Sequence, residues 1–469
     1  MSEALNKLRL IVGDAGFITH GRVADALLTD ERGLYTGRAA AIVQPQTTVE
    51  LAEAVRICYD AGIGMVPQGG NTGYCGGATP DGSGTEVLFN LSRMNTVGQV
   101  DKHDFTITAQ AGVVLSVAQQ VAAEHDLLLP LSMGSEGSCQ LGGNVSTNAG
   151  GLAVLRYGTA RELVAGLEVV LPDGRVWRDL KGLRKDNTGY DLKQLFMGAE
   201  GTLGIISTVV LRLHPMPRSR VTAWLSIDDI GKAVTLLTSL RSELGDCITS
   251  FEYISREAMA LVLRHVPGTT NPIATAQGHS VLIELVAYDD GSTLTNQLER
   301  ALADALETNG INDAVIAQSD RQRLAFWRLR ESIPASEKRA GGSVKHDVSV
   351  PIGGLHAYAN DAVDAMQTAF PNSRLSIYGH VGDGNIHFNV LPPEGEKLDR
   401  YRQQNADAIS KLIHGLAVDR NGSFSAEHGV GKLKRDVLAE MGDPIGLQLM
   451  RQLKTTLDPK GLMNPGKVL

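Results

Sequence analysis

The sequence predicts an α+β protein with two or three domains. At 469 residues the chain is too long for one ordinary hydrophobic core. Segments of helical periodicity alternate with short β-branched runs and Gly-rich turns, and Pro215 and Pro217 mark the clearest boundary among them. We therefore expect one domain over residues 1–215, a second over 216–415, and a C-terminal segment over 416–469 that packs back on the first.

The N-terminal domain begins with a helical pattern over residues 1–38. A further helix is expected to begin at Thr48, a plausible N-cap, and to end at Gly62. Four apolar side chains share one face of this helix: Leu51, Ala54, Val55 and Cys58. Residues 63–66 then predict a short buried strand that leads into the Gly-rich turn at 67–73. Helix, strand and Gly-rich turn in this order are typical of an α+β domain that holds a cofactor.

The rest of this domain alternates strands and helices in the same way. A strand is predicted at 106–112, an amphipathic helix at 115–125, and a strand at 167–171 that enters a Pro-Asp-Gly turn. A second loop rich in Gly and Asn covers residues 138–151, and a β-branched run at 200–213 closes the domain.

The second domain has helical patterns separated by short strands. These patterns cover residues 230–244, 294–308, 355–369 and 398–419. They fit a second α+β unit and show no repeat of fixed length.

Composition and charge exclude several classes of protein. The net charge of −8 disfavours a nucleic-acid partner, and no apolar run approaches the ~20 residues that cross a bilayer. The four cysteines (Cys58, Cys75, Cys139 and Cys247) form no CxxC pair, so we expect reduced thiols and no cysteine-bound zinc or iron–sulfur cluster. Residues 1–13 lack the apolar core of a signal peptide, and we expect a cytoplasmic location.

The two Gly-rich loops predict a cradle for a large anionic cofactor. Backbone N–H groups in turns bind anions, and glycine lets the chain approach a phosphate without a Cβ clash. Two nucleotide motifs are incomplete. Residues 62–67 have Pro at the third glycine of GxGxxG, and residues 461–467 resemble a P-loop but are followed by Val468 instead of Ser or Thr. Neither a Rossmann site nor nucleoside triphosphate hydrolysis is therefore favoured.

A cluster of histidines and a carboxylate predicts metal and acid–base chemistry. A hairpin turn at 382–385 would bring His380 and His387 together. With Glu427 they form a three-ligand set that leaves room for substrate, as in a catalytic zinc site, although manganese or cobalt could use the same set. His428 need not bind the metal, and Asp383 could be either a ligand or a turn residue.

Several sequence motifs carry a family resemblance that spans nearly the whole chain. PQGGNTG at 67–73, GSCQLGGNVSTNAGG at 137–151, RKDNTGYDLKQLF at 184–196 and EGTLGIIS at 200–207 resemble the FAD-linked oxidases of the vanillyl-alcohol oxidase type. GHVGDGNIH, SAEHGVGKLKRD and LDPKGLMNPGK narrow the resemblance to the FAD-dependent D-2-hydroxyacid dehydrogenases, and among these to the D-2-hydroxyglutarate type.

The resemblance implies a two-part FAD-binding domain, a substrate (cap) domain and a short helical C-terminal segment. It assigns FAD contacts to Pro67, Gly69, Gly70, Asn71, Thr72, Gly73, Gly142, Asn144, Asn148, Gly151, Ile205 and Asn464. The first loop has no histidine of the kind that tethers flavin in some relatives, so FAD is expected to be non-covalent. The resemblance also makes His380, His387 and Glu427 ligands of a divalent metal, most simply Zn²⁺, and His428 the base.

Two cationic side chains, Arg330 and Lys345, help to predict which substrate is bound. In relatives of the D-2-hydroxyglutarate type, Arg and Lys at the positions of Arg330 and Lys345 bind the distal carboxylate, and Asn389 and His428 match further substrate positions. Pro334 replaces a Thr found in some of these enzymes, so D-malate stays open. The alternatives are a D-lactate or glycolate dehydrogenase, a flavin-free zinc hydrolase and a non-catalytic subunit. For the dehydrogenase we expect a homodimer that passes electrons to electron-transfer flavoprotein or a quinone.

Overall fold

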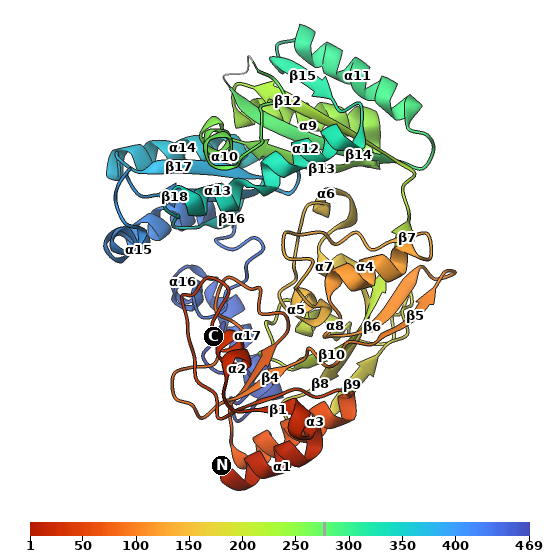
Figure 1. Cartoon of the computed structure of the whole chain (residues 1–469), viewed down its shortest axis with the longest axis vertical. Coiled ribbons are helices and arrows are strands. Elements are labelled where there is room, and N and C mark those ends of the chain that lie inside the picture. The colour runs from red at the N-terminus through yellow and green to blue at the C-terminus, as the bar shows by residue number, and fades with distance from the viewer. Residues whose placement is uncertain (275–277) are drawn as a thin grey trace. The chain divides into compact units, whose positions relative to one another are not determined.

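The structure is a computed structural model that describes residues 1–274 and 278–469 (Figure 1). The chain forms two compact units. Unit 1 contains residues 1–151, 158–216 and 427–469, and unit 2 contains residues 152–157 and 217–426. Unit 2 is therefore inserted into unit 1 along the sequence.

Unit 1 holds a small sheet of four strands and a larger one of five. The first has the order β1-β2-β4-β3, in which β4 is parallel to both β2 and β3: β1 (Phe17–Ile18), β2 (Ala41–Val43), β4 (Val87–Asn90) and β3 (Met65–Gln68). The second is antiparallel in the order β5-β6-β10-β8-β9: β5 (Val97–Asp101), β6 (Thr106–Gln110), β10 (Ile205–Arg212), β8 (Val164–Val170) and β9 (Val176–Asp179). The short strands β7 (Leu127–Leu128) and β11 (His214–Pro215) pair beside them.

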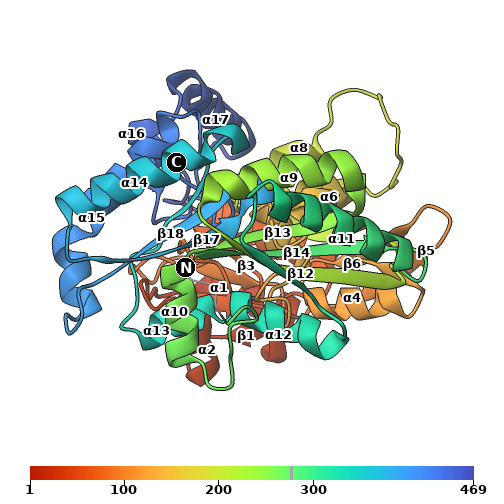
Figure 2. The ribbon, with the colours of Figure 1, turned by 90° about the horizontal axis from the view of Figure 1, so that it is seen from above.

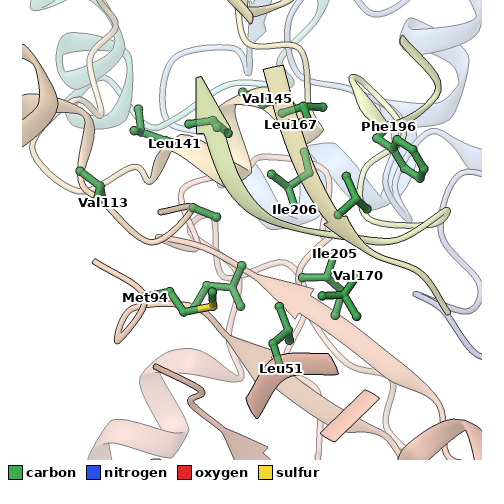
Figure 3. Close-up of a cluster of buried hydrophobic side chains, with 14 of the residues drawn as sticks. Leu51, Met94, Val113, Leu141, Val145, Leu167, Val170, Phe196, Ile205 and Ile206 are labelled. Carbon is green, nitrogen blue, oxygen red and sulfur yellow. The ribbon is translucent and has the colours of Figure 1, made fainter. Parts of the chain in front are cut away.

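One hydrophobic core joins these sheets to most helices of unit 1, while Ala24 of α2 packs with Ile42 and Leu88 in a smaller cluster. Figure 3 shows Ile205 and Ile206 of β10 close to Leu167 and Val170 of β8, in the same buried cluster as Leu51. The helices are α1 (Ser2–Val12), α2 (Arg22–Leu27), α3 (Thr48–Ala61), α4 (Leu115–Ala123), α5 (Leu141–Ser146), α7 (Ala160–Leu163), α8 (Lys193–Phe196), α16 (Arg435–Met441) and α17 (Pro444–Leu457).

The ends of α3 show what the local sequence determines. Thr47, one residue before the expected cap, accepts a hydrogen bond from the Glu50 backbone, and Gly62 ends the helix in the left-handed conformation at φ 67°. The helical pattern expected over residues 1–38 is interrupted at Gly13 and Gly21, both at positive φ, so two separate helices, α1 and α2, form there with β1 between them.

Unit 2 is an antiparallel sheet of seven strands covered by helices on both faces. Its order is β15-β12-β14-β13-β17-β18-β16: β15 (Asp313–Ile316), β12 (Ser219–Ile227), β14 (His279–Ala287), β13 (Ile248–Ile254), β17 (Arg374–His380), β18 (Asn385–Leu391) and β16 (Asp347–Ser349). Its helices are α6 (Val154–Tyr157), α9 (Ile230–Leu244), α10 (Arg256–His265), α11 (Ser292–Glu307), α12 (Asp320–Glu331), α13 (Ile333–Arg339), α14 (Leu355–Ala369) and α15 (Leu398–Val418).

Alternation along the strands of unit 2 creates two separate cores. In β12, Ala223 and Leu225 join the cluster formed with α9, α11, α14 and α15, whereas Trp224 between them joins the cluster formed with α10, α12 and α13. Figure 2 shows α9, α11 and α14 on one side of this sheet and α10, α12 and α13 on the other.

Residues 416–426 differ from the expected division of the chain. They continue α15 to Val418 and then pair with β16, where the backbones of Ser423 and Ser349 exchange two hydrogen bonds, so they belong to unit 2. The tail lies in unit 1, where residues 462–464 bond to Met65 of β3. In the described part of the chain no helix combines the length and the apolar character needed to span a membrane.

Candidate active site

The first Gly-rich loop leaves β3 and turns sharply against the second loop. A Cβ added to Gly70 would lie 2.1 Å from the carbonyl oxygen of Ser138, so only glycine allows the two loops to touch here. Asn71 has φ 56°, and its side-chain amide donates a 2.8 Å hydrogen bond to the carbonyl of Thr29. The loop is thus held in a conformation that L-residues seldom adopt.

A pocket in unit 1 is lined by both Gly-rich loops, by the start of β10 and by His428. Nine of the twelve predicted cofactor residues line it: Pro67, Gly69, Gly70, Asn71, Thr72, Gly73, Gly142, Asn144 and Ile205. Sequence reasoning missed other lining residues in or near these segments, including Gln68, Cys75, Gln140 and Glu200. Their only signal was their place beside the glycines.

The other three predicted cofactor residues hold chain segments in place. Asn148 accepts hydrogen bonds from the hydroxyl of Thr159 and the backbone of Arg161. Gly151 donates its backbone N–H to the Glu427 carboxylate at 3.0 Å. The amide of Asn464 donates to the carbonyls of Gly77 and Glu200, and it therefore ties the tail to two residues that line the pocket.

The pocket presents open backbone and one unsatisfied polar atom to a ligand. A Cβ added to Gly73 or Gly143 would meet no atom within 4 Å, so the backbone at both positions faces open space. Within the described chain, the buried Oε1 of Gln140 has no hydrogen-bond partner, and Gln140 lines the pocket. A ligand donor at this point would satisfy it.

Glu200 anchors the segment that carries His428. Its carboxylate accepts hydrogen bonds from the backbones of Val430 and Gly431, both at 2.7 Å. Burial raises the pKa of this carboxyl, while the two backbone donors and Lys434 oppose that shift. The imidazole of His428 packs edge-on against the ring of Tyr74, with the ring centroids 4.9 Å apart. His428 therefore lies at the wall of the pocket on a fixed segment.

His380 and His387 come together in unit 2, as the hairpin prediction requires. They flank the turn between β17 and β18, where Gly384 adopts φ 80°, and their ring centroids lie 5.7 Å apart. Asp383 accepts a 3.0 Å hydrogen bond from the Asn385 backbone, a contact typical of a turn residue. Burial raises the pKa of Asp383.

Each of these histidines faces a buried carboxylate directly across the sheet. Glu252 of β13 is the register partner of His380, and its Oε1 lies 2.5 Å from the Nδ1 of that ring. Asp347 of β16 is the register partner of His387, with 3.6 Å between Oδ1 and Nδ1. Burial alone would raise the pKa of Glu252, but the charges of Arg330 and His380 outweigh it and lower this pKa to about 2.

Both predicted substrate cations are paired with buried carboxylates. The Nε of Arg330 lies 2.6 Å from Glu252, and its guanidinium lies over the Tyr378 ring, 4.7 Å from the centroid. Lys345 lies 2.8 Å from Glu337, whose other oxygen accepts a 2.9 Å hydrogen bond from Asn389. Glu252 lies 78 residues from Arg330, so local sequence does not reveal this pair, whereas Glu337 lies only 8 residues from Lys345 but belongs to no motif that marks it as its partner.

The comparisons with known proteins identify the family of the chain. The model of the family "FAD linked oxidases, C-terminal domain" matches residues 216–468, and that of "FAD binding domain" matches residues 39–179. The mitochondrial D-2-hydroxyglutarate dehydrogenase of Rattus norvegicus is 38% identical over 440 residues, covering 92% of this chain and 78% of the relative. Its counterpart in Arabidopsis thaliana is 34% identical over 468 residues, covering 100% and 82%.

A solved structure shows the same fold at low sequence identity. The crystal structure of p-cresol methylhydroxylase with substrate bound matches with a TM-score of 0.75 at 17% identity, covering 100% of this chain and 96% of the other. This match confirms the predicted α+β fold with an FAD-binding domain of the vanillyl-alcohol oxidase type. Taken with the two family models, the similarity shows that the chain belongs to the FAD-linked oxidases and is a relative of the D-2-hydroxyglutarate dehydrogenases.

Proposed function

We propose that this FAD-dependent hydroxyacid dehydrogenase oxidises D-2-hydroxyglutarate, or a close relative such as D-malate, to the 2-oxo acid. The observation that carries the proposal is the position of Tyr378 on β17. Its ring lies below the Arg330 guanidinium and 5.0 Å from the His387 ring, and its hydroxyl lies 3.4 Å from the Asn389 amide. One side chain thus links the predicted substrate cation, a predicted metal ligand and a predicted substrate contact.

The proposed metal ligands are His380, His387 and Glu427, with Zn²⁺ the simplest ion and Mn²⁺ or Co²⁺ able to use the same donors. Within unit 2, the Ala426 backbone donates a hydrogen bond to the carbonyl of Asp347, the register partner of His387. Glu427 follows Ala426 along the chain and is proposed as the third ligand. A bound divalent ion would lower the pKa of a substrate hydroxyl.

FAD is proposed to bind non-covalently in the pocket of the two Gly-rich loops, where it would accept the hydride from the substrate. Backbone N–H groups of the loops would hold its phosphates, since glycine permits close approach. No residue from Pro67 to Gly73 is a histidine. The aromatic contact between His428 and Tyr74 would hold the imidazole at the pocket wall, where it accepts the hydroxyl proton as general base.

Anaerobic bleaching of the flavin absorbance by a panel of D- and L-2-hydroxy acids tests the proposed reaction. We expect D-2-hydroxyglutarate to reduce the flavin fastest and the L-isomers to leave it oxidised. Reduction by L-isomers alone would contradict the proposal. A holoprotein that no hydroxy acid reduces would instead favour the non-catalytic subunit.

A D-lactate or glycolate dehydrogenase is the second candidate, and one observation favours it. Glu337 neutralises Lys345, so this lysine offers a distal carboxylate less charge than its sequence position suggests. The same panel separates the two candidates, because a monocarboxylate enzyme would reduce its flavin with D-lactate or glycolate in preference to D-2-hydroxyglutarate.

The route of the electrons, the oligomeric state and the location stay predictions. No disulfide joins any of the four cysteines and no two of them form a CxxC pair, which supports transfer from flavin to an external acceptor such as electron-transfer flavoprotein or a quinone. Assays of flavin reoxidation with each acceptor test this. A homodimer and a cytoplasmic location are still proposed, although the names of both relatives place those proteins in mitochondria.

A further inference from the structure

The Glu252 carboxylate uses both of its oxygens in unit 2. It lies on β13 with a side-chain exposure of 1%. Oε1 lies 2.5 Å from the Nδ1 of His380, and Oε2 lies 2.6 Å from the Nε of Arg330. A single buried carboxylate therefore joins a proposed metal ligand to a proposed substrate cation.

The contact with His380 determines which imidazole nitrogen can bind a metal. An ionised carboxylate only accepts hydrogen bonds, so Nδ1 of His380 must carry a proton. In the neutral ring the lone pair is then on Nε2. Carboxylates that hold metal-binding histidines in this way fix both the tautomer and the orientation of the ring.

The contact with Arg330 fixes the plane of the guanidinium. Nε is held by Glu252 on one side, and the Tyr378 ring lies against the guanidinium on the other, 4.7 Å from centroid to Cζ. A guanidinium group whose plane is already fixed loses less rotational freedom when it binds a carboxylate. Glu252 therefore prepares Arg330 as well as His380.

We propose that Glu252 is a positioning residue that couples metal affinity to recognition of the distal carboxylate. The inference rests on the proposed function. It adds that the metal site and the site for the distal carboxylate both depend on the Glu252 side chain. A merely structural role, in which Glu252 and Arg330 only form a buried ion pair of the core, predicts a change in stability and no change in metal affinity.

The test is the Glu252→Gln variant, purified with FAD bound. Glutamine can accept from one partner, but its amide N–H₂ then faces the donor of the other. In competition with a chromophoric chelator we expect Zn²⁺ affinity to fall about 10- to 100-fold, the usual effect of losing such a partner. With the metal site saturated, KM for D-2-hydroxyglutarate should rise at least several-fold while KM for D-lactate changes little.

Glu284→Gln is the matched control. Glu284 lies on the neighbouring strand β14 and is also buried, and it binds Arg220 and the indole of Trp327, outside the proposed site. This variant should lose stability and keep wild-type Zn²⁺ affinity. The proposal fails if Glu252→Gln keeps Zn²⁺ affinity within twofold of wild type, or if both variants lose it equally.

Two further results keep the outcomes separate. If Glu252→Gln does not fold, Glu252→Asp retains the charge but shortens the reach, and a Zn²⁺ affinity unchanged in that variant would equally overturn the proposal. If the wild type binds no Zn²⁺ or oxidises no hydroxy acid, the proposed function fails instead. A fall in Zn²⁺ affinity without the KM difference would reject the coupling to Arg330.

Discussion

Lys345 and Glu337 form an ion pair, so replacing either residue also changes the environment of the other. The Glu337 side chain is 1% exposed and lies 2.8 Å from the Lys345 ammonium, with Ser343 and Asn389 as its other donors. Removing the lysine would leave a buried carboxylate without its cation. Activity lost in a Lys345 variant would therefore mix substrate binding with folding.

We predict that Lys345→Met lowers the free energy of unfolding by about 1–3 kcal/mol, because the buried Glu337 carboxylate loses its charged donor. The double variant Lys345→Met/Glu337→Gln should recover most of that loss, because the buried charge is gone. Urea unfolding of the two variants and the wild type measures both effects. Equal stability of the single and double variants would contradict this account of the pair.

His428 is predicted to act in the chemical step. His428→Ala should slow flavin reduction by substrate about 10²- to 10⁴-fold, the range usual for loss of a general base. FAD content should stay unchanged, because the two Gly-rich loops remain. Stopped-flow absorbance gives the rate, and Tyr74→Phe is the control that keeps the ring contact. Undiminished reduction in His428→Ala would remove this residue as the base.

At the scale of elements, the close contact between the two Gly-rich loops predicts a sharp response to one methyl group. Gly70→Ala places a Cβ 2.1 Å from the Ser138 carbonyl, so the loops must separate, and we expect most of the bound FAD to be lost. Gly82→Ala is the control, since its added Cβ meets nothing within 4 Å. The ratio of absorbance at 450 and 280 nm, read as flavin per chain, measures the outcome. Equal occupancy in both variants would contradict it.

Glu168 joins several elements of unit 1 and gives a prediction on pH. Burial would raise its pKa, but hydrogen bonds from Thr48 and Ser207 and the contact with Arg178 lower it below its usual value. The ionised form is thus favoured in the folded state. The stability it contributes is complete above the unfolded pKa of about 4.3 and is lost as the pH falls through the folded pKa.

The wild type should therefore exceed Glu168→Gln in free energy of unfolding at pH 7, and the difference should shrink between pH 5 and pH 3. Denaturant unfolding at several pH values checks this. A difference that stays constant over that range would show that the charge of Glu168 contributes nothing.

Sequence patterns identified elements well where the signal is local. The periodicity of α9 and α14 marked both of their ends, and Gly62 marked the end of α3. The hairpin of His380 and His387 was also visible, since its turn is short. The pairing of Glu252 with His380 was not, because 128 residues separate them and the register of a sheet is set by long-range packing.

At the scale of the whole molecule, protein groups hold both His380 and His387 in place. Glu252 and Asp347 lie across from them in the sheet, so a chelator should remove activity and leave the fold in place. We predict loss of flavin reduction after dialysis against EDTA, recovery on adding Zn²⁺, and unchanged FAD content and circular dichroism. Full activity in metal-free protein would contradict the proposed metal.

The bonds of Asn464 to residues that line the pocket have a consequence for the order in which the protein folds during its synthesis. Residues 65, 77 and 200, in or next to the pocket, are translated long before residues 462 and 464, which bond to them. Unit 2 is complete by residue 426, so it can fold on the ribosome while unit 1 still waits for its last segment. The proposed FAD pocket gains His428 and the bonds of Asn464 only when that segment arrives, so we expect stable insertion of FAD to be a late step in the maturation of this enzyme.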